Sequence, residues 1–219
     1  MQLTQVFKYS KWTHAEDLIR WGRIRVGTLY DYQDIERHGL GVGEAEEGKK
    51  SRYDNPPVTR ASDLSTFAAP FVQSAFQNLS PDAIFAQCVF ERIEESPNCW
   101  LYCLSERLSF RTMDSMRAAY DSCVRIANVL GFFQAICQTL NRMGPLHGGQ
   151  IIRVKYRNRS QHYLEDDGLP PWALKNPCYS AQEEIRFAYF PANELALKHI
   201  DLTIPWLKAF CEPAKDIPG

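Results

Sequence analysis

The residues best suited to chemistry lie near the C-terminus, where three polar side chains precede an apolar run. Gln182, Glu183 and Glu184 come directly before residues 185–190, which are rich in branched and aromatic side chains and are followed by a proline. This pattern predicts a strand. Because alternate residues of a strand point to the same face, we expect Gln182, Glu184 and Arg186 to share one face. An amide, a carboxylate and a guanidinium on one face can bind a ribose hydroxyl or stabilise a sugar cation.

Both short acidic motifs of the chain also have a purely structural explanation. Gln182-x-Glu184 is short enough to occur by chance in a chain of ordinary composition, so a solvated strand start explains it as well. Glu44-x-Glu46 lies in a glycine-rich segment, for which solvated charges are the expected state. The first motif therefore gains weight from the polar residues that accompany it elsewhere in the chain.

Polar and aromatic side chains close the two strands that we expect near the N-terminus. Aromatic rings and a cation near a carboxylate would suit a nucleotide, stacking on its base and pairing with its phosphates. Tyrosines are equally common as core aromatics with a hydroxyl at the surface, so both interpretations stand. The residues are Lys8, Tyr9 and Ser10 at the end of the first strand and Thr28, Tyr30 and Tyr32 at the end of the second.

Two residues in the middle of the chain are further candidates. Ser105, followed by Glu106, ends a strand expected over 99–104, although an ordinary strand end with a cap would look the same. Arg125 lies inside an apolar strand expected over 122–127. A partly buried arginine needs a carboxylate or phosphate partner, and an internal salt bridge is the commoner explanation.

Cysteine and histidine usage argues against two classes of site, a zinc site and a hydrolase triad. The chain has seven cysteines and no secretory signal, which indicates reduced thiols that are mostly buried. Cys99 and Cys103 lie four residues apart, but no second pair or nearby histidine completes a zinc site, so we expect no metal. The five histidines are scattered and no serine elbow accompanies them, which gives no support to a hydrolase triad.

Charge and hydropathy bound the partners of the chain. A net charge of -1 argues against nucleic-acid binding through bulk charge, although Arg153, Lys155, Arg157 and Arg159 could form a local basic groove. No run approaches the length of a transmembrane helix, and the N-terminus lacks the apolar core of a signal peptide. We therefore expect a cytoplasmic protein with no membrane partner.

Hydrophobic periodicity predicts more strands than helices, and the strands fall in runs. This order favours an α+β fold with a mostly antiparallel, split or sandwiched β-sheet and flanking helices. We expect a single domain over 1–219, with a long glycine-rich and acidic loop at about 33–60 and a turn at 95–98 that joins two paired strands. Thr13 is the expected N-cap of the first helix and Gly22 its end. The expected strands cover 3–9, 23–30, 84–93, 99–104, 122–127, 150–156, 185–190 and 195–204, and the expected helices cover 13–21, 62–79, 113–120 and 129–143.

Three segments together resemble the ADP-ribosyltransferase fold. Val6-Phe7-Lys8-Tyr9, followed by Ala15-Glu16-Asp17-Leu18-Ile19 and Gly22, resembles its first strand and first helix. Leu104-Ser105 is similar to its middle strand that ends in a hydroxyl, and Gln182-Glu183-Glu184 is similar to its late strand with Q-x-E or E-x-E. The opening, the acidic glycine-containing loop and the late strand also resemble a bacterial and phage family of domains. Lys8 stands where such enzymes usually have an arginine or histidine, and Ser105-Glu106 where many have a serine-threonine-serine triplet.

The resemblance implies an ADP-ribosyltransferase-like fold, with NAD as the substrate and no metal. The implied reaction cleaves the nicotinamide–ribose bond and transfers ADP-ribose to an acceptor, which could be a protein or nucleic acid. Glu184 would stabilise the ribose cation, Gln182 would orient the acceptor, and the loop over 39–50 would cover the site. Lys8 or Arg125 would pair with the pyrophosphate, and Tyr9 or Tyr30 would stack on nicotinamide. The implied NAD-binding residues are Lys8, Tyr9, Ser10, Thr28, Tyr30, Ser105, Arg125 and Arg186.

Two other classes of function remain open at the level of sequence. One is a non-catalytic nucleotide-binding or protein-interaction regulator on the same fold, which would use the same cleft without transfer chemistry. The other is an interaction domain in which residues 182–184 are an exposed strand start. Convergence of Glu184 and Lys8 in one pocket would favour a ligand site, and wide separation would favour the interaction domain.

Overall fold

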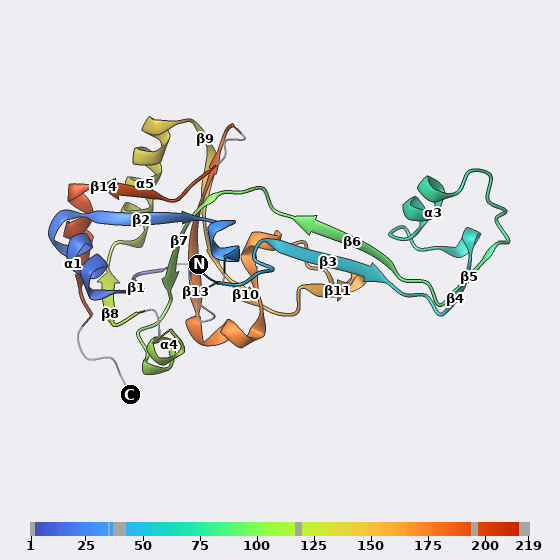
Figure 1. Ribbon diagram of the computed structural model, residues 1–219, viewed down its shortest axis with the longest axis horizontal. Helices are drawn as coiled ribbons and strands as arrows, with labels where there is room; N and C mark the ends of the chain where they lie inside the picture. Colours follow the sequence, from blue (N-terminus) through green and yellow to red (C-terminus); the bar gives the residue numbers. More distant parts are fainter. Residues whose placement is uncertain (1–2, 35, 37–42, 117–119, 194–196, 215–219) are drawn as a thin grey trace.

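The structure is a computed structural model that describes residues 3–34, 36, 43–116, 120–193 and 197–214. Its largest sheet is formed by β1 (Val6–Ser10), β2 (Arg23–Thr28), β7 (Trp100–Ser105), β8 (Ser122–Ile126), β9 (Leu146–Arg153), β13 (Glu184–Pro191), β14 (Ile200–Thr203) and β15 (Cys211–Pro213). These strands run in the order β14-β2-β7-β1-β8-β15, while β13 pairs with both β7 and β9 (Figure 1). Every strand pair in this sheet is antiparallel, which confirms the predicted α+β class with mostly antiparallel strands.

The main core lies between this sheet and two helices, α1 (Trp12–Trp21) and α5 (Val129–Met143). The predicted limits of α5 are confirmed, because Phe132, Ile136 and Leu140 recur every four residues and are fully buried. Their partners include Phe187 of β13, which also has no exposed surface. Burial of large apolar side chains at this face stabilises the sheet that carries the polar residues described below.

The two ends of α1 are capped in different ways. Gly22 ends it in the left-handed conformation, with a φ of 66°, as the sequence predicts. The prediction of Thr13 as the N-cap is wrong, because the helix starts at Trp12 and Lys11 occupies the N-cap position without a side-chain hydrogen bond. The backbone N–H of Trp12 instead donates to Asp121, which precedes β8, so a distant segment caps the helix.

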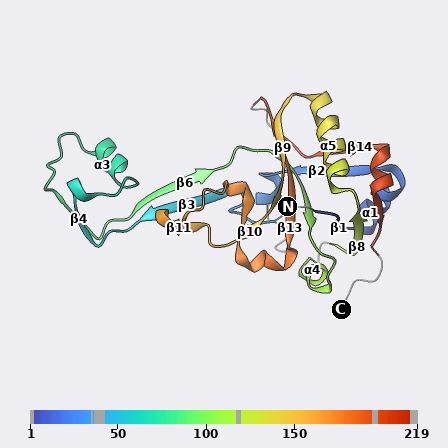
Figure 2. The ribbon, with the colours of Figure 1, turned by 180° about the vertical axis from the view of Figure 1, so that it is seen from behind.

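A ribbon of strands extends from the main sheet and carries a separate tip (Figures 1 and 2). The ribbon consists of β3 (Lys49–Asp54) paired with β6 (Phe90–Glu95), and β11 (Ser160–His162) pairs with β3 in parallel. The tip contains β4 (Val58–Arg60), α3 (Ala69–Ala75) and β5 (Ile84–Ala86), and β4 pairs with β5. We call the ribbon the arm and residues 55–90 the arm tip.

The arm corrects two expectations. The segment 33–60 is not a loop throughout, since β3 and β4 occupy 49–54 and 58–60. Strands 84–93 and 99–104 do not pair as a hairpin, because β6 pairs with β3 whereas β7 pairs with β13, β2 and β1. Opposite charges explain the partner of β6, since Lys49 and Lys50 lie opposite Glu95 and Glu94. The apolar β7 is instead a central strand of the large sheet.

Several other elements differ in extent from the prediction. The helix expected over 62–79 is limited to α3, and the one expected over 113–120 is α4 (Phe110–Ser115), with 117–119 outside the described residues. The last predicted strand, 195–204, is β14, and 195–196 also lie outside the described residues. In the described part of the chain, the remaining strands are β10 (Lys155–Tyr156) and β12 (Leu174–Lys175). The 3-10 helices there are η1 (Asp31–Gln33), η2 (Ala61–Asp63), η3 (Tyr163–Glu165), η4 (Pro171–Ala173), η5 (Pro177–Gln182) and η6 (Pro205–Phe210).

Candidate functional site

A cavity of about 50 Å³ lies where β1, β7 and β13 meet. Titratable side chains make up most of its lining, which is unusual for a cavity beside an apolar core and typical of a functional site. Lys8 and Glu184 both line it, so the two residues whose convergence favours a ligand site are together. The lining residues are Lys8, Tyr9, Tyr32, Glu47, Cys103, Leu104, Ser105, Met116, Tyr120, Lys175, Gln182, Glu184 and Arg186.

Strand register brings these side chains together. Glu184 of β13 lies opposite Ser105 of β7, and Arg186 lies opposite Cys103. On the other edge of β7, β2 pairs with the beginning of the strand and β1 pairs with its end, at Phe7 and Ser105. The sheet is therefore split along this edge, and Lys8 Nζ donates to the Cys103 carbonyl oxygen within the split at 2.8 Å.

Glu184 is held by two cations. Its Oε2 accepts from Lys175 Nζ at 2.7 Å, and its Oε1 accepts from Arg186 Nε at 2.6 Å. Burial alone would raise the pKa of Glu184, but the Arg186 and Lys175 charges outweigh it and hold the pKa well below the usual range. Lys175 Nζ also donates to Gln182 Oε1 at 2.8 Å, so one amine orients both members of the Q-x-E motif.

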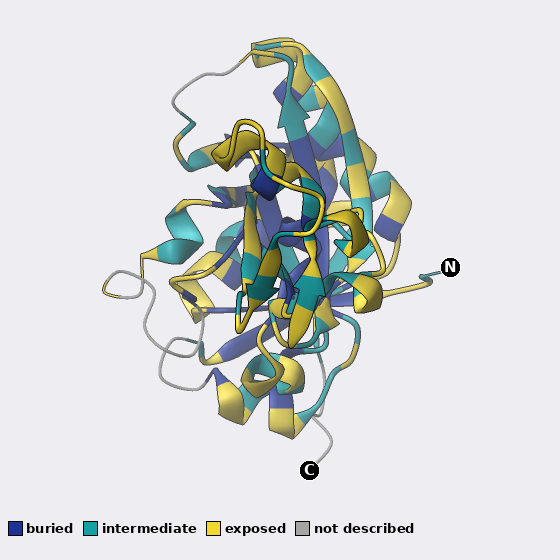
Figure 3. Ribbon diagram, turned by 90° about the vertical axis from the view of Figure 1, so that its right-hand side faces the viewer, coloured by how far each residue is buried: buried dark blue, intermediate teal, exposed yellow. Residues whose placement is uncertain are grey.

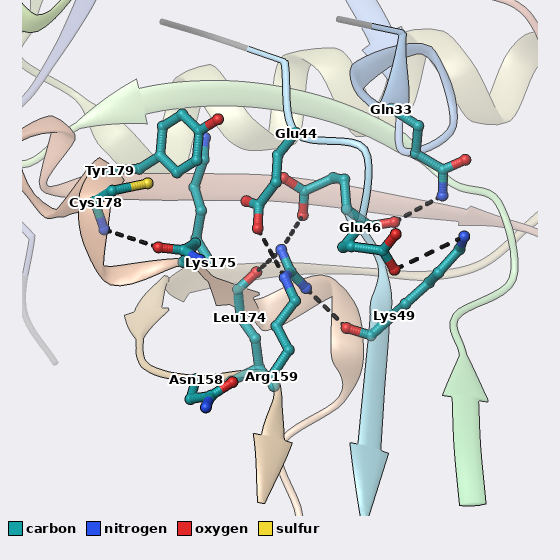
Figure 4. A network of polar contacts seen from close by, with 12 residues as sticks. Gln33, Glu44, Glu46, Lys49, Asn158, Arg159, Leu174, Lys175, Cys178 and Tyr179 are labelled. Atoms are coloured by element: carbon teal, nitrogen blue, oxygen red, sulfur yellow. Dashed lines mark hydrogen bonds and ion pairs between the residues drawn. The ribbon is translucent and has the colours of Figure 1, made fainter. Parts of the chain in front are cut away.

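Arg186 extends this ion-pair network toward the acidic loop. Its guanidinium donates to both oxygens of Glu47 at 2.8 and 3.0 Å, in the bidentate geometry that favours arginine. Arg159 Nη2 then contacts Glu47 at 3.4 Å, and Arg159 Nε donates to Glu44 at 2.8 Å. Figure 4 shows Arg159 reaching toward Glu44 and toward the carbonyl oxygens of Lys49 and Leu174. The network thus joins the site to residues 44–49.

The acidic loop therefore differs from the solvated segment that the sequence suggests. Glu44 is only 7% exposed and Glu47 only 1% exposed, whereas Glu46 remains exposed. The reason is that Arg159 and Arg186 supply buried positive charge for them. The sequence predicts that a loop over 39–50 covers the site. Residues 39–42 of that loop lie outside the described residues, so the prediction stands untested for them.

Lys8 has a different environment from the other cations of the cavity. Within the described residues it forms no ion pair, and its ammonium lies 4.7 Å from the ring centroid of Tyr102. Burial lowers the pKa of Lys8, and the nearby Glu184 charge offsets this effect only in part. A cation without a carboxylate partner at a cavity wall is suited to an anionic group of a ligand.

The hydroxyl and thiol groups of the cavity are neutral at physiological pH. Burial raises the pKa of Tyr9, Tyr120 and Cys103 to about 12. Tyr9 is fixed by the segment after β7, because its hydroxyl accepts from the Ser109 N–H at 2.9 Å. Ser105 Oγ donates to the Arg107 carbonyl oxygen at 3.1 Å in the same segment. These groups are hydrogen-bonding elements of the wall rather than nucleophiles.

The structure places four predicted residues away from the cavity. Thr28 and Asp31 hydrogen-bond each other at the start of η1. Tyr30 is 44% exposed and donates to the Ser96 carbonyl oxygen. Ser10 is buried at the end of β1, outside the cavity lining. Arg125 pairs with Glu212 of the neighbouring β15, which agrees with a salt bridge within the fold.

The sequence did not assign six residues of the lining to a ligand site. Lys175 carried a signal, since it is a lysine directly after the apolar run 172–174 between proline-containing segments. Glu47 had none, because nothing local distinguishes it from Glu46. The others are Cys103, Leu104, Met116 and Tyr120, whereas Tyr32, a candidate from the sequence, does line the cavity.

The basic residues from the end of β9 onward do not form an open groove for a nucleic-acid strand. Arg153 pairs with Glu106, and Lys155 with Asp167. Arg157 contacts Asp167 at 2.8 Å, and Arg159 is held by the acidic loop. Because each positive charge has a carboxylate partner, the segment offers little net field for phosphates.

The arrangement as a whole can hold a permanent negative charge next to a cation and several neutral hydroxyl groups.

Within the described residues, no group of histidine, cysteine, aspartate or glutamate side chains could hold a metal ion. The described helices include none that is both long and apolar enough to cross a membrane. Comparison of the chain with models of protein families, with curated proteins and with solved structures finds no match.

Proposed function

We propose that the protein binds NAD at this cavity and breaks the bond between nicotinamide and ribose, transferring ADP-ribose to an acceptor or to water. The observation that carries the proposal is that Lys8, Ser105 and Glu184, from three adjacent strands, line the same cavity. The fold in this proposal is ADP-ribosyltransferase-like. It is supported by a mostly antiparallel sheet that is split beside β7, with the cavity at the split.

Glu184 is the proposed catalytic residue. When the bond between nicotinamide and ribose breaks, the electron pair of that bond leaves with nicotinamide, which becomes neutral. The ribose carbon then gains positive charge. A carboxylate that stays ionised stabilises that charge through a region of low dielectric. Each oxygen of Glu184 accepts one hydrogen bond from a cation, and a carboxylate oxygen has two acceptor positions, so one position on each oxygen remains for a ribose hydroxyl.

The other proposed roles follow from position in the cavity. Lys8, which lacks a carboxylate partner among the described residues, would pair with the pyrophosphate. Tyr9 lines the same cavity and would contact nicotinamide, whereas Tyr30 and Arg125 are not part of the cavity lining and have no role in this proposal. Gln182 would orient the acceptor nucleophile, which attacks the ribose carbon and releases a proton.

The size of the cavity sets a condition on the proposal. Its volume of about 50 Å³ is well below the roughly 300–1,000 Å³ of a pocket for a drug-sized ligand. A dinucleotide therefore binds only if the walls move apart. Binding of NAD should accordingly change the exposure of wall residues, and this change can be measured by hydrogen exchange.

The test is release of nicotinamide from NAD by the purified protein, followed by chromatography. Glu184→Gln keeps the shape of the side chain and removes its charge, and we expect it to lower the rate by about a hundredfold or more. Glu183→Gln is the matched control, because Glu183 is the next carboxylate in the sequence but does not line the cavity. Full activity of a folded Glu184→Gln variant would refute the assignment of Glu184.

One observation favours a second candidate, a nucleotide-binding regulator without transfer chemistry. Both oxygens of Glu184 are already engaged by cations, which would reduce their effect on a ribose cation. Such a protein would be protected by NAD against thermal unfolding and would release no nicotinamide. Release above the rate of a Glu184→Gln control would contradict this candidate.

A further inference from the structure

The arm tip differs from the rest of the chain in composition. Between Asn55 and Phe90 the charged residues are limited to Arg60, Asp63 and Asp82, whereas charged residues make up 23% of the whole chain. The same segment contains five of the 12 phenylalanines, at positions 67, 71, 76, 85 and 90. A surface with so few charges and so many aromatic residues is typical of a contact surface.

The tip is too small to bury its own apolar residues. Only Ala68 and Val72 of its apolar residues are buried, although its phenylalanine rings form a chain of contacts with centroid distances of 5.6–6.4 Å. Units of fewer than about 40 residues rarely form a sufficient core without further support. Four large apolar side chains are more than half exposed, namely Val58 (65%), Phe76 (52%), Ile84 (68%) and Val89 (66%).

The position of the tip favours contact with another molecule. It lies at the far end of the arm, away from the main sheet in both views (Figures 1 and 2). Figure 3, in which the tip faces the viewer, shows exposed and partly exposed residues over the tip and buried strands behind it. Two tips can therefore meet without a clash between the two bodies.

The tip is also complementary to itself. β4 and β5 pair only with each other among the described residues, so each has an outer edge that another strand can join. Arg60 and Asp82 carry opposite charges on the same surface, and their mutual contact is loose, at 3.9 Å with side chains 65% and 85% exposed. At a two-fold interface, such a pair forms two reciprocal contacts, Arg60 to Asp82 of the partner and the reverse.

We propose that the arm tip is a contact surface between two copies of this chain, related by a two-fold axis. The exposed residues Val58 and Ile84 of β4 and β5 lie at its centre. Arg60 and Asp82 pair across it. This inference is independent of NAD binding, because the tip residues are absent from the lining of the site cavity.

Sedimentation velocity of the full chain over a wide range of concentrations tests the proposal. We expect a reversible dimer whose dissociation constant rises by at least about tenfold in Ile84→Asp and in Val58→Asp, as at the centre of an interface. Leu130→Asp is the matched control, because this leucine is 58% exposed on α5 of the body and an aspartate is favourable in the first turn of a helix. Far-ultraviolet circular dichroism melts check that each variant folds.

Charge reversal tests the reciprocal pair. Arg60→Glu and Asp82→Arg should each weaken the homodimer through like-charge contacts, and an equimolar mixture of the two variants should form a heterodimer. A wild-type chain that is monomeric at every concentration would overturn the proposal. Binding of such a monomer to vesicles of a zwitterionic lipid would show that the tip contacts a membrane and not a second copy, and this result would overturn the proposal too. A dimer that Ile84→Asp and Val58→Asp leave unchanged, or a mixture that does not associate, would overturn it as well.

Discussion

Replacing Arg186 with methionine should strongly destabilise the protein. The guanidinium has almost no exposed surface and binds two buried carboxylates, Glu47 in bidentate geometry and Glu184 at 2.6 Å. Removing one partner of a buried ion pair costs about 3–5 kcal/mol, because the remaining charge stays buried without compensation. Two buried carboxylates each lose one of two cations here, while Lys175 stays beside Glu184 and Arg159 beside Glu47, so we expect a loss within this range, about 3–5 kcal/mol. This is a large share of the roughly 5–15 kcal/mol by which domains are stable.

The assay is urea unfolding followed by circular dichroism, with Arg125→Met as the matched control. Arg125 also lies on a strand of the large sheet and also pairs with a glutamate, but its side chain is 41% exposed and that of Glu212 is 49% exposed. Exposed pairs of this kind contribute less than about 1 kcal/mol. Equal losses in the two variants would refute the conclusion that the network around Arg186 is a buried and interdependent unit.

The same comparison predicts a dependence on pH. In the wild type the pKa of Glu184 is held below its ordinary value of 4.5, so the stability that this group contributes is present at neutral pH and is lost as the pH falls into the acid range. Arg186→Met removes the larger of the two lowering charges, and the buried carboxylate then becomes easier to protonate. The stability difference between wild type and variant should therefore shrink as the pH falls below 4.5, and a constant difference would contradict the cause that we assign.

Three further results are expected. Gly22→Ala should cost about 2 kcal/mol or more in urea unfolding, because φ is positive and a Cβ would overlap the backbone after β14, whereas Gly144→Ala has open space. Lys50→Met should speed hydrogen exchange in β3 and β6 but not in β7, because buried Lys50 holds the carboxylates of Glu94 and Asp166 near the base of the arm. Exchange in β3 and β6 at the wild-type rate would contradict this role. Of the seven cysteines, exposed Cys178 should react first with a thiol reagent, and Cys103 should stay protected because burial raises its pKa to about 12.

The sequence predicted the parts of the fold that depend on local patterns. The limits of α5 follow from a helical repeat of apolar residues, and the end of α1 follows from Gly22. Glu184 and Arg186 share one face of β13, as alternation predicts, whereas Gln182 is the last residue of η5 and lines the cavity from there, because Glu183 has a left-handed backbone. Local rules sufficed there because the pattern and the tertiary environment agree.

The parts that depend on distant pairing could not be predicted in the same way. The sequence pattern predicted that β6 pairs with β7 in a hairpin. In the structure β6 pairs instead with β3, whose lysines lie some forty residues earlier in the chain and opposite the glutamates of β6. Glu47 and Glu44 looked solvated because their partners, Arg186 and Arg159, lie more than a hundred residues away in the chain. Burial of a charge depends on its partner, and a single sequence does not indicate which distant arginine that partner is.

The most direct test of the central claim, that the cavity between β1, β7 and β13 binds NAD, is the midpoint of thermal unfolding with and without NAD. A ligand at about 100 times its dissociation constant stabilises the folded state by about 2.7 kcal/mol, so the midpoint of the wild type should rise by several degrees. Lys8→Met should fold normally and lose most of this shift, because Lys8 lines the cavity and has no carboxylate partner among the described residues. An unchanged wild-type midpoint, or an equal shift in Lys8→Met, would contradict the claim.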